Sequence, residues 1–284
     1  MFAQARYSGN QLAVVTHADN LSFGEMQKIA NEMHFSETAF VLSDKPKDNG
    51  YDVHIFTPTT EVPFAGHPTL GTAYVIKHFI AKKPLQEITL NLKVGQIKVT
   101  FETLPNVGEI LWMKQVQPKF GEKFSVELFQ NLLGLENLDF NLNFPIQEVS
   151  TGLPFVIVPL KSLVAVKKAK VNQTLLTQLL KKTQAGILIF CPQSYNEENK
   201  LNVRVFVDAF GIPEDPATGS GNGCLAAYLS RYRFFGSSQI DIQVEQGFEV
   251  GRPSILHLKA RKTGDTIDIY VGGWVFEIAK GKLL

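Results

Sequence analysis

Short apolar runs separated by turn residues dominate the pattern of the chain, and most of them predict β-strands. The clearest hairpins are predicted in EITLNLKVGQIKVTF (residues 87–101) and IDIQVEQGFEVGRPSILHL (residues 240–258). Two predicted helices, Pro68 to Ile80 and Gly223 to Tyr232, carry small or apolar residues on nearly every face. Such a helix needs burial on all sides. We therefore expect a curved sheet to wrap around each of these two helices.

A third helix is predicted over MQKIANEM, and the residues just before it carry a helix-start signal. Ser22 and Glu25 have the spacing of a capping box, in which each side chain bonds the backbone amide of the other residue. The helix is expected to end near His34. Glu37 then lies just past its end.

The two halves of the chain repeat one another in the same order. VHIF (Val53 to Phe56) ahead of EVPFAGHPTLGTAY corresponds to VRVF (Val203 to Phe206) ahead of EDPATGSGNGCLAAY, with three extra residues in the second copy. GNQLAVV parallels GLPFVIV, and the turn of the first hairpin parallels EQGFEVGRPSILHL. These ordered matches indicate a duplication. The aligned motif positions are Glu61 with Glu214, Pro63 with Pro216, Gly66 with Gly219 and Ala73 with Ala226.

The repeat predicts an α+β fold of two pseudo-symmetric lobes, each a curved, mostly antiparallel sheet wrapped around a central helix. We expect an N-terminal lobe over residues 1–115, completed by a C-terminal strand at residues 271–284, and a C-terminal lobe over residues 116–270. The active site is expected in a cleft between the lobes.

The composition of the chain limits which classes of binding partner and which cellular compartment are expected. The 28 basic and 27 acidic residues are interspersed and give a formal net charge of +1, so neither nucleic acid nor an anionic membrane is an expected partner. The two cysteines, Cys191 and Cys224, exclude a disulfide framework and suit a reducing cytoplasm. No signal peptide is recognisable, and apolar runs such as Ile187 to Cys191 are too short to span a bilayer. We expect a cytoplasmic protein with a small-molecule partner.

Two stretches rich in small residues precede the buried helices and carry the candidate chemistry. GHP places Gly66 and His67 at one helix start, and EDPATGSGNG places Gly219, Ser220 and Gly221 at the equivalent point of the second copy. A helix start has unpaired backbone amides and a partial positive charge, so it can bind a carboxylate or phosphate. The alternative is that the small residues only let each helix pack closely. The double occurrence of the motif favours an anion site.

No cofactor or metal is expected at these motifs. Seven or more residues separate each motif from the preceding strand, unlike a dinucleotide-binding fingerprint, and no lysine follows as in a phosphate-binding loop. The histidines show no HExxH or similar spacing, which disfavours metal-assisted hydrolysis.

Four segments of the chain, GNQLAVV, NEMHFSETAFVL, FTPTTEVPFAGHPTLGTA and EDPATGSGNGCLAAYL, resemble the PhzF family of phenazine-biosynthesis-like proteins, and the resemblance runs through nearly the whole chain. It implies the diaminopimelate epimerase-like fold, with two similar lobes. It also implies a cofactor-independent isomerase, since a characterised member isomerises trans-2,3-dihydro-3-hydroxyanthranilate. The family's dimeric habit implies a homodimer.

The resemblance assigns roles to three side chains and one backbone segment. It implies that Glu37 is the acid/base, that His67 and Asp215 hold polar groups of the substrate, and that the Gly219 to Gly221 backbone meets the substrate's carboxylate. Taken alone, a glutamate after a helix end is usually a surface charge. His67 alone could equally be a packing or capping residue, and Asp215 before Pro216 could cap a turn.

The chain also departs from related patterns. Two-cysteine epimerases of this fold carry thiols at places that align here with Ala65 and Thr218, so thiol-based racemisation is not expected. Cys224 lies inside an apolar helix and is expected to be a core residue. Relatives usually have a fuller first strand ahead of Ala5, and we expect the chain to begin inside that strand.

The leading functional hypothesis is an isomerase in which Glu37 takes a proton from an activated carbon of a small carboxylate-bearing substrate, such as a cyclic conjugated one, and returns it elsewhere on the same molecule. The alternative is a non-catalytic small-ligand-binding or scaffold protein that retains the fold.

Overall fold

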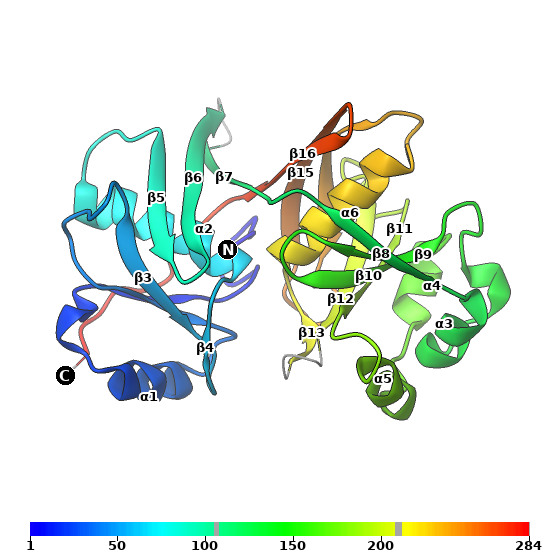
Figure 1. The fold of residues 1–284 in the computed structure, drawn as a ribbon, viewed down its shortest axis with the longest axis horizontal. Helices are drawn as coiled ribbons and strands as arrows, with labels where there is room; N and C mark the ends of the chain where they lie inside the picture. Colours follow the sequence, from blue (N-terminus) through cyan, green and yellow to red (C-terminus); the bar gives the residue numbers. More distant parts are fainter. Residues whose placement is uncertain (105–107, 208–211, 284) are drawn as a thin grey trace. The chain divides into compact units, whose positions relative to one another are not determined.

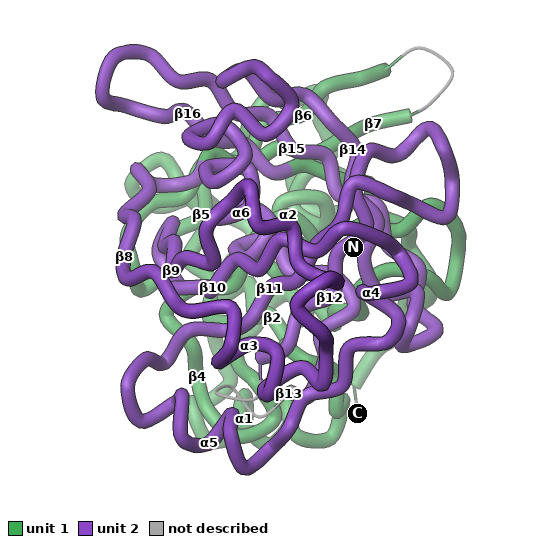
Figure 2. Tube along the Cα trace, turned by 90° about the vertical axis from the view of Figure 1, so that its right-hand side faces the viewer, with its two compact units in different colours: residues 1–114, 272–284 green, residues 115–271 purple. Residues whose placement is uncertain are grey.

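The structure is a computed structural model that describes residues 1–104, 108–207 and 212–283. The chain separates into two compact units, coloured in Figure 2. Unit 1 contains residues 1–114 and 272–284, and unit 2 contains residues 115–271.

Unit 1 combines one mixed sheet with a surface helix and a buried helix (Figure 1). Its strand order is β1-β2-β3-β5-β6-β7, with β4 paired to β3. The pairs β1–β2 and β3–β5 are parallel, and the hairpin pairs β5–β6 and β6–β7 are antiparallel. The elements are β1 (Ala13–Val15), η1 (Ala18–Asn20), α1 (Phe23–Met33), β2 (Thr38–Val41), β3 (Tyr51–Phe56), β4 (Glu61–Val62), α2 (Gly66–Val75), η2 (Ile76–Ala81), β5 (Glu87–Leu92), β6 (Gly95–Leu104) and β7 (Gly108–Lys114).

Helix α1 begins and ends where the sequence predicts. The Ser22 side chain accepts a hydrogen bond from the Glu25 amide, and the Glu25 carboxylate accepts one from the Ser22 amide at 2.8 Å, which completes the capping box. His34 adopts the left-handed conformation with φ of 54°, which ends the helix. Residue 37 then leads directly into β2.

Helix α2 is the centre of unit 1, and every residue from Gly66 to Ala73 is buried. It contacts strands from both ends of the sheet order, β1 and β2 as well as β6 and β7, so the sheet curves around it. The predicted burial on all sides is confirmed up to Ala73, whereas the later part of the predicted helix is partly exposed, with His78 exposed. The helix begins at Gly66, earlier than the expected Pro68, because the first-turn amides need no intrahelical partner and a proline in that turn loses no bond. A π-helical turn, η2, continues it.

Unit 2 repeats this design and packs further helices against its sheet (Figure 1). Its strand order is β16-β15-β14-β12-β11-β10-β9-β8, with β13 paired to β12. The elements are β8 (Lys119–Phe124), α3 (Val126–Leu133), η3 (Asn137–Asp139), β9 (Ile146–Ser150), β10 (Pro154–Pro159), α4 (Leu163–Lys168), α5 (Gln173–Leu180), β11 (Gly186–Cys191), β12 (Leu201–Val207), β13 (Ile212–Asp215), α6 (Gly219–Arg231), β14 (Gln239–Gln246), β15 (Ser254–Thr263) and β16 (Thr266–Gly273).

Helix α6 is the counterpart of α2, and its residues from Gly219 to Ser230 are all buried. It contacts β9, β10 and β11 as well as β14 and β15, so this sheet also curves around its helix. The opposite face of β10 and β11 packs against α3, α4 and α5 in a separate apolar core that includes Phe129, Leu176 and Ile187. The α+β fold of two similarly built units, each a curved sheet around a central helix, is confirmed.

Two expected boundaries differ from the structure. Helix α6 begins at Gly219 instead of Gly223, so Gly219, Ser220 and Gly221 form its first turn. The strand expected over residues 271–284 is present only at its start, because β16 ends at Gly273 and residues 274–283 form neither helix nor strand. Leu284 lies outside the described residues. Within the described ranges, no helix is both long and apolar enough to cross a membrane.

The hydroxyl of Tyr228 connects α6 to the segment before β9, and this contact gives a first prediction. Tyr228 is fully buried, and its hydroxyl donates to the Pro145 carbonyl at 2.6 Å. We expect Tyr228→Phe to lower the free energy of unfolding by about 1 kcal/mol, because the partly buried hydrogen bond to the Pro145 carbonyl is lost. Urea denaturation measures the change. Tyr51→Phe is the matched control, since Tyr51 is 8% exposed and its hydroxyl forms no hydrogen bond with the described residues, and an equal loss in both variants would contradict the prediction.

Candidate active site

In unit 1, the side chains of Glu37 and His67 lie next to each other. Glu37 lies between α1 and β2, and His67 lies in the first turn of α2. The distance from His67 Nε2 to Glu37 Oε2 is 3.4 Å. The Glu37 side chain is 16% exposed and that of His67 is 6% exposed, so the carboxylate is mostly shielded but still within reach of a small molecule. Two residues that the sequence singled out separately therefore form one group.

A backbone carbonyl next to His67 and the burial of the ring determine the tautomer and the charge of this histidine. His67 Nε2 also lies at hydrogen-bond distance, 3.1 Å, from the Gln11 carbonyl oxygen, and because a carbonyl can only accept, this nitrogen carries the proton of the neutral ring. Burial lowers the pKa of His67 to about 3. At neutral pH the imidazole is therefore an uncharged donor, and Glu37 is the member of the pair that can take up and return a proton.

In unit 2, Asp215 lies at the end of β13, directly before the turn into α6. Its Oδ2 accepts a hydrogen bond of 2.5 Å from the Thr218 hydroxyl, and its backbone carbonyl accepts one of 2.7 Å from Gln246 Nε2. Gln246 Oε1 in turn accepts from the Thr218 amide at 3.2 Å and from Asn222 Nδ2 at 2.8 Å. All four side chains are buried, so Asp215 is held in a fixed orientation at the helix start.

The start of α6 keeps backbone donors available. Thr218 is the residue before the helix, and its side chain does not cap the first-turn amides: its hydroxyl donates to Asp215, and its oxygen accepts from Gln246 Nε2 at 3.0 Å. The amides of Gly219, Ser220 and Gly221 belong to a first turn, where no intrahelical acceptor exists. This geometry suits a bound anion.

Close packing, the alternative reason for small residues, also applies at this helix. A Cβ atom on Gly221 would lie 3.3 Å from Phe155 Cε1 and 3.4 Å from Leu188 Cδ1, and one on Gly223 would lie 3.0 Å from Gln115 Cγ. These distances are tight for a Cβ atom, so the glycines also let α6 approach its sheet. The packing explanation of the motif is therefore supported, most clearly at Gly223, which lies beyond the first turn, and the anion site stays a prediction.

The cysteines lie away from this chemistry. Ala65 and Thr218 are the residues immediately before α2 and α6, and neither carries a thiol. Cys224 is fully buried within α6, and burial raises its pKa to about 12. A thiol that remains protonated in the core is a poor nucleophile or base.

Sequence reasoning did not identify the residues that hold the site in place. Gln246 reads as an ordinary polar residue of a hairpin, and Gln11 acts through its backbone carbonyl, which no motif reveals. Arg204 could have been found, because the internal repeat aligns it with His54 and both precede the aligned glutamate of their own copy.

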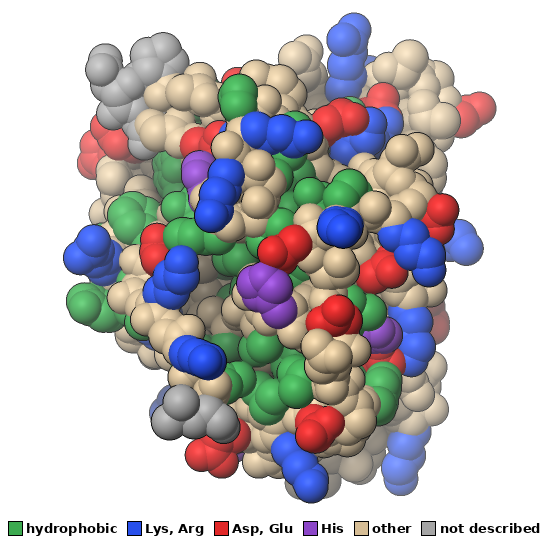
Figure 3. Space-filling view, turned by 90° about the vertical axis from the view of Figure 1, so that its left-hand side faces the viewer, with side chains coloured by type: hydrophobic (Ala, Val, Ile, Leu, Met, Phe, Trp, Pro, Cys, Tyr) green, Lys and Arg blue, Asp and Glu red, His purple; other side chains and the backbone are tan. Residues whose placement is uncertain are grey.

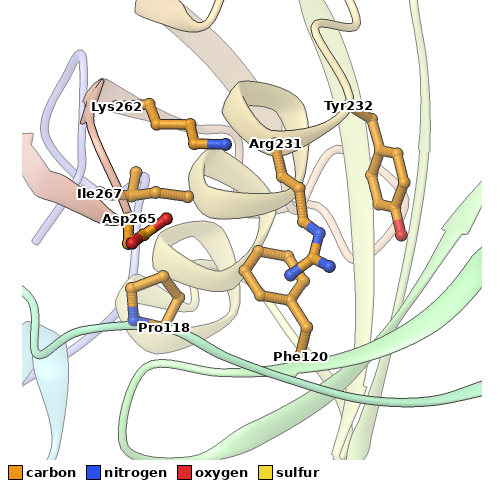
Figure 4. Close-up of a pocket in the computed structure, with 7 residues that line it drawn as sticks. All are labelled: Pro118, Phe120, Arg231, Tyr232, Lys262, Asp265 and Ile267. Atoms are coloured by element: carbon orange, nitrogen blue, oxygen red, sulfur yellow. The ribbon is translucent and has the colours of Figure 1, made fainter.

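A pocket of about 440 Å³ lies elsewhere in unit 2 and contains none of the predicted site residues (Figure 4). Arg231 lies over the Phe120 ring at 4.1 Å from its centroid. Lys262 and Asp265 face the same space. Acidic and basic side chains also alternate over the face shown in Figure 3, in line with the balanced composition.

Comparisons with known proteins agree with the motifs. The family model "PhzC-PhzF: Phenazine biosynthesis-like protein" matches residues 1–275. An uncharacterized isomerase of Clostridium acetobutylicum is 33% identical over 300 residues, covering 100% of this chain and 95% of the relative. The trans-2,3-dihydro-3-hydroxyanthranilate isomerase of Pseudomonas aeruginosa is 32% identical over 284 residues, covering 99% of this chain and 96% of the relative.

A solved structure shows the same fold. The phenazine biosynthesis protein of the PhzF family from Bacillus anthracis superimposes with a TM-score of 0.87 and 30% sequence identity, covering 96% of this chain and 92% of that chain. The family match across the chain and the full-length relatives confirm the resemblance first seen in the motifs. The chain belongs to the PhzC-PhzF family of phenazine biosynthesis-like proteins, and like its curated relatives it is an isomerase.

Proposed function

We propose that this isomerase moves a proton within a small carboxylate-bearing substrate by acid/base catalysis at Glu37, without a cofactor. The observation that carries the proposal is the pairing of the mostly shielded Glu37 carboxylate with a neutral His67. One carboxyl group can take a proton from an activated carbon and return it to another position of the same molecule. A conjugated ring of the trans-2,3-dihydro-3-hydroxyanthranilate type, the substrate named for the Pseudomonas aeruginosa relative, offers such a carbon.

His67 supports this role as a hydrogen-bond donor. Its Nε2–H donates to the Gln11 carbonyl while Glu37 Oε2 lies 3.4 Å from the same nitrogen, and its low pKa keeps it from becoming an imidazolium that would hold Glu37 in an ion pair. Glu37 is then available as the base. His67 Nδ1, the acceptor nitrogen of this tautomer, can accept a hydrogen bond from a polar group of the substrate.

Asp215 and the start of α6 take the binding roles in this proposal. The amides of Gly219, Ser220 and Gly221 bind the substrate's carboxylate, in the way that helix starts bind anions. Asp215, held by Thr218 and Gln246, accepts hydrogen bonds from the substrate's amino or hydroxyl groups. Gly66 supplies a further first-turn amide at the start of α2.

The test is conversion of trans-2,3-dihydro-3-hydroxyanthranilate in deuterated water after exhaustive chelation. We expect turnover to persist within about twofold of the unchelated enzyme, because the proposed steps use only side chains of the chain. We expect deuterium at a product carbon, detected by NMR, to the extent that the Glu37 proton exchanges with solvent. Turnover lost on chelation and restored by one metal ion would overturn the cofactor-free mechanism. Binding of this substrate without turnover would favour a ligand-binding protein instead.

The proposal also includes a reducing cytoplasmic setting and a homodimer. Both cysteines are free and buried, which is compatible with a reducing compartment. The dimer follows from the family's habit, and light scattering of the purified chain would measure it directly.

A further inference from the structure

A buried ion pair joins β12 to the strand that carries Asp215. Arg204 Nε donates to Glu214 Oε1 at 2.9 Å and Nη2 donates to Oε2 at 2.8 Å, which is the bidentate geometry of guanidinium and carboxylate. Arg204 is only 9% exposed. Its Nη1 donates to the carbonyls of Val166 and Ala169, both at 2.9 Å, at the end of α4. All three guanidinium nitrogens are engaged, so Glu214 is held in one position.

This ion pair affects the orientation of the Asp215 side chain, because Glu214 and Asp215 are neighbours in β13. Neighbouring residues of a strand point to opposite faces, so fixing Glu214 toward Arg204 directs Asp215 to the other face. On that face Thr218 and Gln246 bind Asp215 at its carboxylate and carbonyl. The register Val205–Asp215 pairs β13 with β12 next to Arg204. Asp215 is therefore clamped between two sets of contacts.

The first copy of the repeat contains a side-chain contact at the corresponding positions. His54 of β3 aligns with Arg204, and its Nδ1 lies 2.6 Å from Glu61 Oε1. Glu61 aligns with Glu214, its side chain is 5% exposed, and it also binds Lys93. The sequence separation is 7 residues in the first copy and 10 in the second, which matches the three extra residues. A nitrogen-bearing side chain of the strand therefore contacts the motif glutamate in both copies, although the residue type and the spacing differ.

A buried ion pair adds little net stability, because the desolvation of both charges offsets their attraction. Its effect is mainly on geometry. We infer that Arg204 is a positioning residue, which acts through Glu214 to orient Asp215 for ligand binding at the start of α6. This inference rests on the proposed function, in which Asp215 binds the substrate.

The test compares Arg204→Lys with Arg231→Lys, a matched control in the same unit. Lysine keeps the charge but loses the bidentate fork, and Arg231 stacks on Phe120 outside the proposed site. We expect Arg204→Lys to raise KM for trans-2,3-dihydro-3-hydroxyanthranilate at least tenfold with kcat within about threefold, and Arg231→Lys to change neither. A merely structural role would lower stability without this selective change in KM. If Arg204→Lys does not fold, Glu214→Gln, which keeps the arginine, is measured in its place.

A second measurement separates the inference from the proposed function. Amide chemical shifts of Asp215, Thr218 and Gly219 report the local orientation without any substrate, and we expect them to move in Arg204→Lys and in Glu214→Gln but not in Arg231→Lys. Unchanged shifts together with an unchanged KM would overturn the positioning role. A wild-type chain that does not convert the substrate would contradict the proposed function instead, and the shifts would still decide whether Arg204 orients Asp215.

Discussion

Glu37→Gln is expected to lower turnover of trans-2,3-dihydro-3-hydroxyanthranilate by about a hundredfold to ten-thousandfold while leaving its affinity within about threefold. The amide keeps the shape of the side chain and can still bond to its surroundings, but it cannot take up and return a proton. Since His67 is neutral with a pKa of about 3, it is a weak base and does not replace the lost carboxylate. Steady-state kinetics give kcat, and titration monitored by NMR gives the affinity.

Glu32→Gln is the control for this change. Glu32 lies on the exposed side of α1, close in sequence to Glu37, so the same chemical substitution removes one carboxylate outside the site. Its turnover should match that of the wild type. A Glu37→Gln chain that binds normally and converts the substrate at the wild-type rate would place the base elsewhere, with His67 and Asp215 as the next candidates.

Features that depend on local sequence were predictable. The capping box of Ser22 and Glu25 fixes the start of α1, because both bonds join residues three apart. The burial of α2 and α6 follows from helices with no polar face. The repeat also extends to side-chain contacts, since the aligned residues His54 and Arg204 each contact the aligned glutamate of their own copy.

Features that depend on distant partners were not predictable. The bond from Gln246 to Asp215 joins residues 31 apart, and that from His67 to the Gln11 carbonyl joins residues 56 apart. The residues next to Gln246 and His67 in the sequence do not indicate which distant residue is the hydrogen-bond partner. The expected strand at residues 271–284 failed beyond Gly273 for a related reason, because a strand forms only where a neighbouring strand pairs with it. Such pairing is decided by the whole sheet.

The neutral state of His67 predicts a pH dependence of stability. In the unfolded chain a histidine has a pKa near ~6.5, whereas burial lowers the pKa of folded His67 to about 3. Between these values the unfolded chain binds a proton that the folded chain does not, so stability falls as the pH drops through this window. From pH ~7 to pH ~5 this histidine alone should reduce the free energy of unfolding by about 2 kcal/mol.

His67→Gln isolates this contribution, because the glutamine amide can still donate to the Gln11 carbonyl but does not titrate. Urea denaturation at the two pH values should show a smaller loss of stability in His67→Gln than in the wild type. His34→Asn is the control, since His34 is exposed and asparagine tolerates its left-handed backbone, and it should keep the wild-type loss. If His67→Gln and the wild type lose the same stability on acidification, the folded imidazole is not held neutral. A charged His67 would then pair with the Glu37 carboxylate, and Glu37 would no longer be the available base.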